Sequence, residues 1–260
     1  MIEILPDRAR FEAAVLTAHG HKKEGIGTQN EKILHAALKK YFLAPGGKEE
    51  VKVGAYYADV MNPDGIVEIQ TGSAGKLTAK LRALLREHRV TVVLPVMRRK
   101  TLYWIDARSG DLSGGRRSPK TGSFTDLLPE LGAFGEFYGN ERFALLFFLY
   151  DGEEYKVTSK NGGKGYGARR VERNPTEALR VTAFDGSPGD FLALLPDLPD
   201  RFKAGDLVKK TSLRGIRLHA ALGVLVSSGA LLKEKEGRFV FYAKQKGGAR
   251  RRPDTERQET

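Results

Sequence analysis

Two carboxylates flank a predicted tight turn in the stretch AYYADVMNPDGIVEIQTGS, residues 55–73. Asp59 falls near the end of one apolar run, and Glu68 lies in the middle of the next. The Asn-Pro-Asp-Gly sequence between them, residues 62–65, favours a turn because proline presets φ and glycine accepts a positive φ. Both flanking runs are rich in β-branched and aromatic residues, which favour strands. The stretch therefore predicts a β-hairpin with an acidic residue on each strand.

The loop length decides whether the two acids face each other. A four-residue loop pairs Asp59 directly with Glu68, whereas a three-residue loop with a bulge shifts the pairing by one, and the sequence leaves both open. Two carboxylates about 5 Å apart repel by roughly 3 kcal/mol at an effective dielectric constant of 20. A divalent cation, Mg²⁺ or Mn²⁺, would offset this repulsion, since such ions take one or two carboxylates and keep several waters. The alternative is an exposed hairpin face on which water solvates both charges.

Composition limits the classes of protein to consider. The 260 residues suffice for one large domain or two smaller ones, and 44 Lys and Arg against 32 Asp and Glu give a net charge of +12. Such an excess favours a polyanionic partner. The absence of cysteine excludes disulfides and thiolate metal sites and favours the reducing cytoplasm. No apolar run reaches the length of a membrane span, so we expect a cytoplasmic protein without a membrane partner.

The hairpin lies within a helix, strand, strand, helix, strand order. Residues 25–42 predict an amphipathic helix that Thr28 caps, with Glu31 completing a capping box. His35 follows Glu31 by one turn, so both side chains can reach one site, although a lone histidine at a helix border is more often structural. Residues 72–88 predict a second helix, and residues 89–96 a strand covered on both faces. This order predicts an α/β unit with a mixed sheet.

Two basic, glycine-rich segments, 108–122 and 159–175, are predicted to be loops between apolar strands at 101–107, 142–157 and 177–184. Trp104 in the first of these strands is expected in the core. Glycine lets a backbone approach phosphates closely, and arginine binds them bidentately. We therefore expect the loops to supply nucleic-acid contacts, namely Arg116, Arg117, Lys120, Lys164, Arg169 and Arg170. The alternative is that long loops are simply polar.

The pattern changes after residue 185. Three helical segments and two strands around Glu236-Gly237 follow within about sixty residues, which is the order of a winged helix, a relative of the helix-turn-helix. The expected domains are therefore 1–185, a winged-helix domain at 186–245, and a disordered basic tail at 246–260. Arg214 and Arg217 lie near the start of the longest helix, where such domains contact bases, although many winged helices bind protein instead.

Residues 27–96 resemble the PD-(D/E)xK nuclease superfamily in the order of elements and the spacing of acids. The superfamily includes restriction endonucleases and archaeal Holliday junction resolvases, and the chain looks most like an uncharacterised bacterial group with a C-terminal winged helix. The resemblance implies a restriction-endonuclease-like mixed sheet flanked by helices. It also implies catalytic roles for Glu31, Asp59, Glu68 and Gln70, with Mg²⁺ or Mn²⁺ held by Asp59 and Glu68.

Gln70 departs from the family pattern, in which a lysine at this position orients the attacking water and offsets negative charge. Glutamine can hold a water by hydrogen bonds but supplies no positive charge. Lys76 and Lys80 on the next helix could supply that charge from another position, or they could lie on a solvated helix face.

The sequence thus predicts a metal-dependent DNA endonuclease or resolvase-like nuclease. The alternative is a catalytically inactive, nuclease-fold DNA-binding or regulatory protein. RNA as the partner and a homodimer both remain open.

Overall fold

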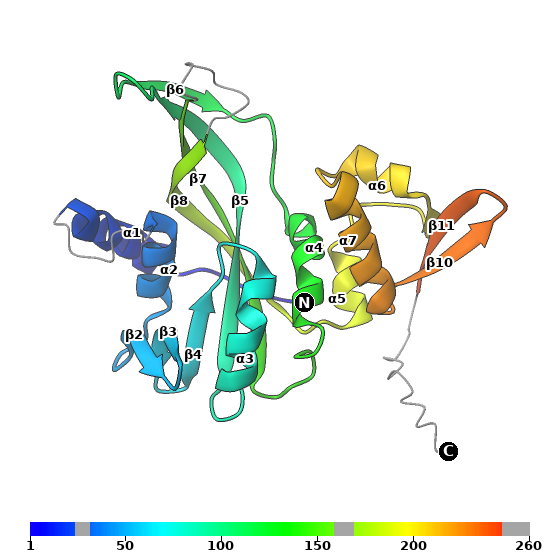
Figure 1. The fold of residues 1–260 in the computed structure, drawn as a ribbon, viewed down its shortest axis with the longest axis horizontal. Coiled ribbons are helices and arrows are strands. Elements are labelled where there is room, and N and C mark those ends of the chain that lie inside the picture. The colour runs from blue at the N-terminus through cyan, green and yellow to red at the C-terminus, as the bar shows by residue number, and fades with distance from the viewer. Residues whose placement is uncertain (24–31, 159–168, 246–260) are drawn as a thin grey trace. The chain divides into compact units, whose positions relative to one another are not determined.

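A computed structural model describes residues 1–23, 32–158 and 169–245 (Figure 1). The chain divides into two compact units. The larger one consists of residues 2–124 and 140–183, and the smaller one of Met1, 125–139 and the chain from Phe184 onward. No helix within the described ranges is both long and apolar enough to cross a bilayer.

The larger unit is built on a mixed sheet of eight strands in the order β1-β8-β7-β5-β4-β3-β2, with β6 paired to β5. Strands β2, β3 and β4 are antiparallel neighbours, whereas β5 runs parallel to both β4 and β7. This confirms the predicted mixed sheet. The strands are β1 (Ile2–Ile4), β2 (Lys48–Val53), β3 (Tyr56–Asn62), β4 (Gly65–Ile69), β5 (Val90–Ile105), β6 (Leu112–Arg117), β7 (Phe143–Val157) and β8 (Arg169–Phe184).

Helices flank this sheet, as predicted: α1 (Arg8–Lys23), α2 (Ile33–Phe42), and the 3-10 turn η1 (Ala74–Leu77) that leads into α3 (Thr78–Leu84). Helices α1 and α2 pack on the sheet through a buried apolar cluster. The cluster includes Phe11, Leu34, Leu38, Tyr41, Val60, Val67, Ile69, Val93, Phe148 and Tyr150. The apolar stripe that the sequence predicts for α2 is therefore the stripe that packs on the sheet.

Helix α2 begins later than its sequence predicts. Its first residue is Ile33, and the residue before it, Lys32, makes no side-chain capping bond. The backbone N–H of Ile33 instead donates to Oε1 of Glu172 on β8, at 3.2 Å. The helix therefore does not run continuously through residue 32 as predicted, because Lys32 is extended and a carboxylate from a distant strand accepts the first N–H of α2. Thr28 and Glu31 themselves lie outside the described residues.

Strand β5 combines two segments, 89–96 and 101–107, that the sequence predicts as separate strands. It runs for sixteen residues because a bulge between Met97 and Lys100 keeps it paired with β7. Trp104, near its end, is only half-buried, with Lys156 Nζ 5.5 Å from the ring centroid, so its expected place in the core is wrong. The predicted loop at 108–122 contains β6, whose exposed residues carry no apolar alternation that would reveal a strand.

The hairpin between β3 and β4 has a two-residue connection. Asn62 pairs with Gly65 and Val60 with Val67, and this register places Asp59 opposite Glu68. Gly65 has a φ of 144°, and a Cβ there would lie 2.6 Å from the carbonyl oxygen of Arg89. Both the conformation and the close backbone approach therefore require glycine.

The smaller unit combines short helices with a three-stranded sheet in the order β10-β11-β9. In addition to the predicted segments, this unit includes residues 125–139. Gly132 in this segment packs closely on α7, since a Cβ at Gly132 would lie 2.9 Å from a methyl group of Val224. Its elements are α4 (Leu128–Leu131), η3 (Gly132–Phe134), α5 (Pro188–Ala193), β9 (Arg201–Phe202), α6 (Ala204–Lys210), α7 (Gly215–Ser227), β10 (Leu231–Glu236) and β11 (Phe239–Lys244), preceded by η2 (Phe124–Leu127) at the border.

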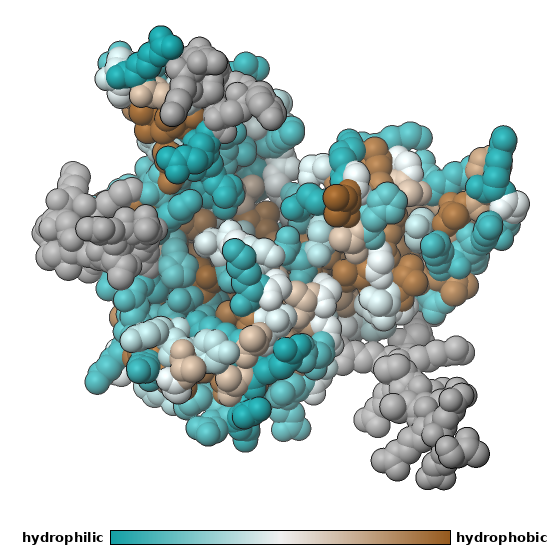
Figure 2. Space-filling model, viewed as in Figure 1, coloured by the Kyte–Doolittle hydropathy of each residue, from teal (hydrophilic) through white to brown (hydrophobic). Residues whose placement is uncertain are grey.

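Exposed large hydrophobic side chains occur on both units, for example Leu5 and Leu16 on the larger one. On the face that Figure 2 shows, the larger unit is largely hydrophilic, and hydrophobic side chains reach the surface among the helices and hairpin of the smaller unit. Ile216 at the start of α7 is 89% exposed, and Leu232 and Phe239 on the hairpin are also exposed.

Candidate functional site

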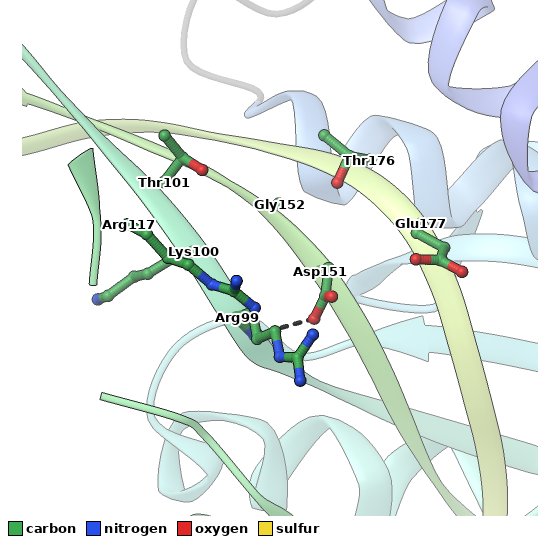
Figure 3. A pocket seen from close by; sticks show the side chains of 8 residues that line it. All are labelled: Arg99, Lys100, Thr101, Arg117, Asp151, Gly152, Thr176 and Glu177. Atoms are coloured by element: carbon green, nitrogen blue, oxygen red, sulfur yellow. Dashed lines mark hydrogen bonds between the residues drawn. The ribbon is translucent and has the colours of Figure 1, made fainter. Parts of the chain in front are cut away.

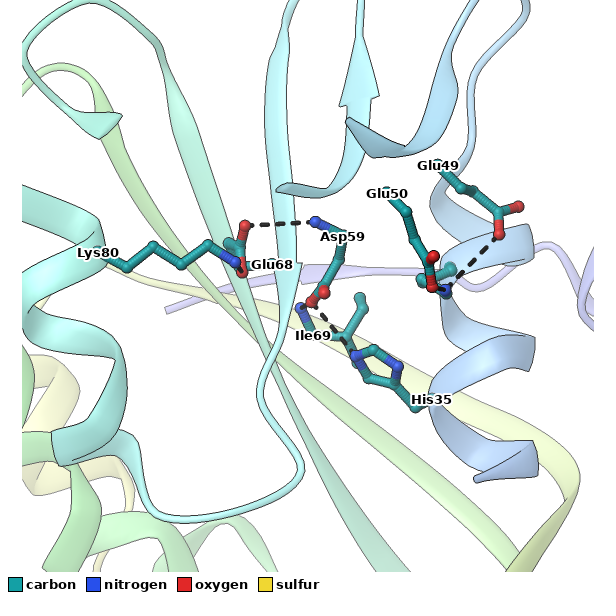
Figure 4. Close-up of polar contacts among 8 residues, drawn as sticks. His35, Glu49, Glu50, Asp59, Glu68, Ile69 and Lys80 are labelled. Atoms are coloured by element: carbon teal, nitrogen blue, oxygen red, sulfur yellow. Dashed lines mark hydrogen bonds and ion pairs between the residues drawn. The ribbon is translucent and has the colours of Figure 1, made fainter. Parts of the chain in front are cut away.

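Asp59 and Glu68 meet where the pairing of β3 and β4 ends. Beyond the Val60–Val67 pair, each carboxylate accepts a bond from the backbone of the other strand (Figure 4). The N–H of Ile69 donates to Asp59 Oδ2 at 2.7 Å, and the N–H of Asp59 lies 3.4 Å from Glu68 Oε1. The structure thus brings together the two acids that the sequence singled out.

Two basic side chains from different helices complete this group. His35 on α2 places Nε2 3.3 Å from Asp59 Oδ2, and Lys80 on α3 places Nζ 2.5 Å from Glu68 Oε2. Figure 4 shows Lys80 and His35 approaching the acids from opposite sides. We call His35, Asp59, Glu68 and Lys80 the acid–lysine site.

The two carboxyl groups have different proton affinities. Glu68 is only 2% exposed, and its burial, together with the nearby charge of Asp59, raises its pKa to about 7 despite the bond from Lys80. Burial would also raise the pKa of Asp59, but the bond and charge of His35 and the N–H of Ile69 outweigh it, so that pKa lies below its usual value. Asp59 is therefore ionised near neutral pH, whereas the carboxyl group of Glu68 titrates in that pH range.

The lysine at the site is Lys80, and Lys76 is exposed one turn earlier. A signal for Lys80 exists in the sequence: it stands three residues after Leu77 and four before Leu84, inside the buried leucine stripe of the helix. Gln70, at the family's lysine position, donates its side-chain NH₂ to the carbonyl of Ser73 at 2.7 Å. Glu31 lies outside the described residues.

An ion-pair cluster around the buried Lys39 borders the site. Lys39, one turn after His35 on α2, is 2% exposed, and its Nζ lies 2.8 Å from Glu50 Oε1. Glu50 has a φ of 53°, which is unusual for a residue with a side chain. Glu49 accepts from Lys40 at 2.6 Å. This cluster fixes the position of α2 beside β2 and thereby the position of His35.

The acid–lysine site offers two carboxylates to a cation. Across the described residues, no set of three or more histidine or acidic side chains is arranged to hold a metal ion. Two carboxylates nevertheless meet the requirement of Mg²⁺, which binds through one or two carboxylates and retains water. The donor set fits a hydrated Mg²⁺ or Mn²⁺ and does not fit an ion that needs a full cage of protein ligands.

The expected nucleic-acid contacts are spread over both units. In the larger unit Arg116 and Arg117 are exposed on β6, Lys120 is exposed shortly after it, and Arg169 and Arg170 are exposed at the start of β8. Lys164 lies outside the described residues.

Both arginines predicted for the smaller unit use part of their donor capacity within that unit. Arg214 donates to the carbonyls of Thr211 and Leu213, at 2.8 and 2.7 Å, and Arg217 donates to that of Asp126 at 2.8 Å.

These features define a two-unit α/β protein whose larger unit carries a partly buried acid–lysine site between a mixed sheet and two of its flanking helices. The chain belongs to the family described as a domain of unknown function (DUF8091), which it matches over residues 32–185. It is 35% identical over 231 residues to an uncharacterized protein of Treponema pallidum (strain Nichols), covering 88% of this chain and 91% of the relative. No solved structure matches the chain. The matched domain contains His35, Asp59, Glu68 and Lys80.

Proposed function

We propose that the protein is a metal-dependent nuclease that hydrolyses phosphodiester bonds in DNA. The observation that carries the proposal is the buried Glu68, held between Asp59 and Lys80 with a pKa near 7. Burying such a group is costly, and apolar residues of similar volume often stabilise a fold equally well. Perturbed, buried ionisable groups that converge from several elements are typical of functional sites.

In this proposal Asp59 and Glu68 hold Mg²⁺ or Mn²⁺. Both bonds of Asp59 use Oδ2, so we assign Oδ1 to the cation. A bound metal ion lowers the pKa of its water and stabilises charge on the phosphate. Lys80 supplies the positive charge that Gln70 lacks, and His35 orients Asp59. Glu31 remains a proposed outer acid.

The element order supports the likeness to PD-(D/E)xK nucleases. Helix α2, strands β3 and β4, helix α3 and strand β5 occur in the order of that core, with the additional strand β2 between α2 and β3, and β5 runs parallel to β4. A winged helix is the proposed fold of the smaller unit, because α5, α6 and α7 precede the β10–β11 hairpin and β9 pairs with β11. The net charge of +12 supports a nucleic-acid partner, and charge alone does not separate DNA from RNA.

A second candidate is a non-catalytic DNA-binding protein of the same fold. Two observations favour it. Lys80 and His35 already offset the two carboxylates without a metal ion, and Gln70 is engaged with a backbone carbonyl. Under this reading the acid–lysine site stabilises the hairpin only.

Nicking of supercoiled plasmid DNA in Mg²⁺ or Mn²⁺ tests the proposal. Asp59→Asn and Glu68→Gln should abolish cleavage, and Lys80→Met should slow it by about a hundredfold, since one electrostatic donor is typically worth that much. The matched controls are Asp64→Asn in the hairpin turn and Lys76→Met one turn before Lys80.

Equal cleavage by site variants and controls would show that the activity resides elsewhere. DNA binding without cleavage on plasmid, branched or single-stranded DNA would favour the non-catalytic candidate.

A further inference from the structure

A polar hollow opens on the larger unit, on strands that do not carry the acid–lysine site. It encloses about 320 Å³ and is formed by neighbouring strands β5, β6, β7 and β8 (Figure 3). Every lining residue is charged, hydroxylated or glycine: Arg99, Lys100, Thr101, Arg117, Asp151, Gly152, Thr176 and Glu177. Such a lining cannot receive an apolar ligand, but it suits a small charged group.

The β5 bulge shapes this hollow. Met97 pairs with Tyr150 and Lys100 with Gly152, so Arg98 and Arg99 together oppose the single residue Asp151. Extra residues of this kind bend a strand and redirect its side chains.

Asp151 fixes both bulge residues. The guanidinium of Arg98 forks around its carboxylate at 3.0 and 2.7 Å, and the backbone N–H of Arg99 donates to it at 2.9 Å. The carboxylate of Asp151 is thus occupied by the backbone and by Arg98, and the side chain of Arg99 is left to line the hollow.

The charge balance in the hollow favours an anion. Lys100 is paired with Glu154 at 3.2 Å, and Glu177 lies 3.6 Å from Arg8. Among the residues that the structure describes, neither Arg99 nor Arg117 has an acidic side chain within ion-pair distance. Figure 3 shows the side chain of Arg117 running toward Arg99, whereas that of Lys100 points away.

We propose that this hollow is a phosphate-binding site that seats one backbone phosphate of the bound nucleic-acid strand. The inference rests on the proposed function, which supplies the nucleic acid as the partner. Guanidinium groups bind phosphate oxygens bidentately, and the hydroxyls of Thr101 and Thr176 add neutral donors. The volume exceeds that of a single phosphate and leaves room for an adjoining sugar. The site positions the strand and reads no sequence, since its lining residues converge on a phosphate.

The test compares two double variants that remove the same charge from two different places on the larger unit. Arg99→Ala/Arg117→Ala removes the two arginine side chains that line the hollow. The control, Arg86→Ala/Arg89→Ala, removes two exposed arginines just before β5 begins. Fluorescence anisotropy with labelled DNA at several salt concentrations gives affinity and its salt dependence. We expect the hollow variant to bind about tenfold more weakly at 0.15 M salt, with a log–log slope about 0.9 shallower for the one lost phosphate contact. The control should stay within about twofold.

A neutral variant separates a hydrogen-bonding site from general charge. Thr176→Val should weaken DNA binding about threefold to tenfold through one lost hydrogen bond and leave the salt slope unchanged. Equal losses from the two arginine pairs, with no effect of Thr176→Val, would overturn the site. Absence of DNA binding by the wild-type protein, together with inorganic phosphate binding that the hollow variant loses, would overturn the strand as the source of the phosphate.

Failure of the hollow and failure of the proposed nuclease are distinguishable. If only the nuclease proposal fails, DNA binding still depends on Arg99 and Arg117 while no cleavage depends on Asp59. If only the hollow fails, cleavage still depends on Asp59 while the two arginine pairs behave alike.

Discussion

At the scale of single residues, the hairpin tolerates two facing acids because neither is left uncompensated. Asp59 and Glu68 each accept a backbone N–H from the opposite strand, and each has its own basic partner. Charged hydrogen bonds to buried carboxylates are worth more than neutral ones. The protein thus compensates the repulsion with its own groups, and a metal ion would enter by displacing the bond from Lys80 or the proton from Glu68.

The raised pKa of Glu68 predicts a specific pH dependence of stability. An acid whose pKa is higher in the folded state binds its proton more tightly there, so its stabilising effect is full below the ordinary value of 4.5 and is lost as pH rises toward 7. The shift from 4.5 to about 7 corresponds to a loss of about 3 kcal/mol. Relative to Glu68→Gln, the wild-type protein should therefore lose stability between pH 5 and pH 7.5.

Urea unfolding of both proteins at the two pH values measures this loss. His35 and Asp59 are present in both, so their titration largely cancels in the comparison. Parallel stability curves for the two proteins would mean that Glu68 is ionised throughout and that Lys80 holds it so.

At the scale of elements, the sequence predicts what depends on local chemistry. The stripe of α2 and the turn at 62–65 follow from the spacing of apolar residues and from proline and glycine, and both are present. The register of Asp59 and Glu68 could not be chosen, because two loop lengths fit the same turn residues. Strand β6 is exposed on all its residues, so only backbone pairing with β5 defines it.

Helix α2 shows the same limit at its start. Its N-terminal cap comes from Glu172, 139 residues away in the sequence, and no local pattern can reveal such a partner. Only the three-dimensional arrangement of β8 beside α2 makes the contact.

That contact predicts a measurable cost. Glu172→Ala should destabilise the protein by about 1 kcal/mol, the usual value of a lost helix cap, and should speed amide exchange in the first turn of α2, which carries His35. Glu177→Ala on the same strand is the control, because its exposed pair with Arg8 is worth at most about 1 kcal/mol and lies away from the helix start. Unchanged exchange at Ile33 and Leu34 in Glu172→Ala would show that water replaces the cap without cost.

At the scale of the whole molecule, the two compact units are not consecutive in the sequence. Residues 125–139 belong to the smaller unit although they interrupt the larger one. Leu128, Leu131 and Phe134 in this segment are fully buried, and α4 packs against α7. A boundary drawn from the change of pattern near residue 185 does not include this segment, because its local sequence predicts a short helix but not the distant helix α7 against which it packs.

This arrangement predicts the outcome of truncation. A chain that ends at residue 185 loses α7 and exposes Leu128, Leu131 and Phe134, whose burial contributes about 1.5–3 kcal/mol for each large apolar side chain. We expect the truncated protein to bind a hydrophobic dye such as ANS and to aggregate on size-exclusion chromatography. A chain that ends at residue 245, lacking only the basic tail, is the control and should elute as the full-length protein does. If the shorter chain is instead monomeric, binds no dye and still binds Mn²⁺ with dependence on Asp59, then the larger unit tolerates 125–139 without its partner helix, and the acid–lysine site folds independently of the smaller unit.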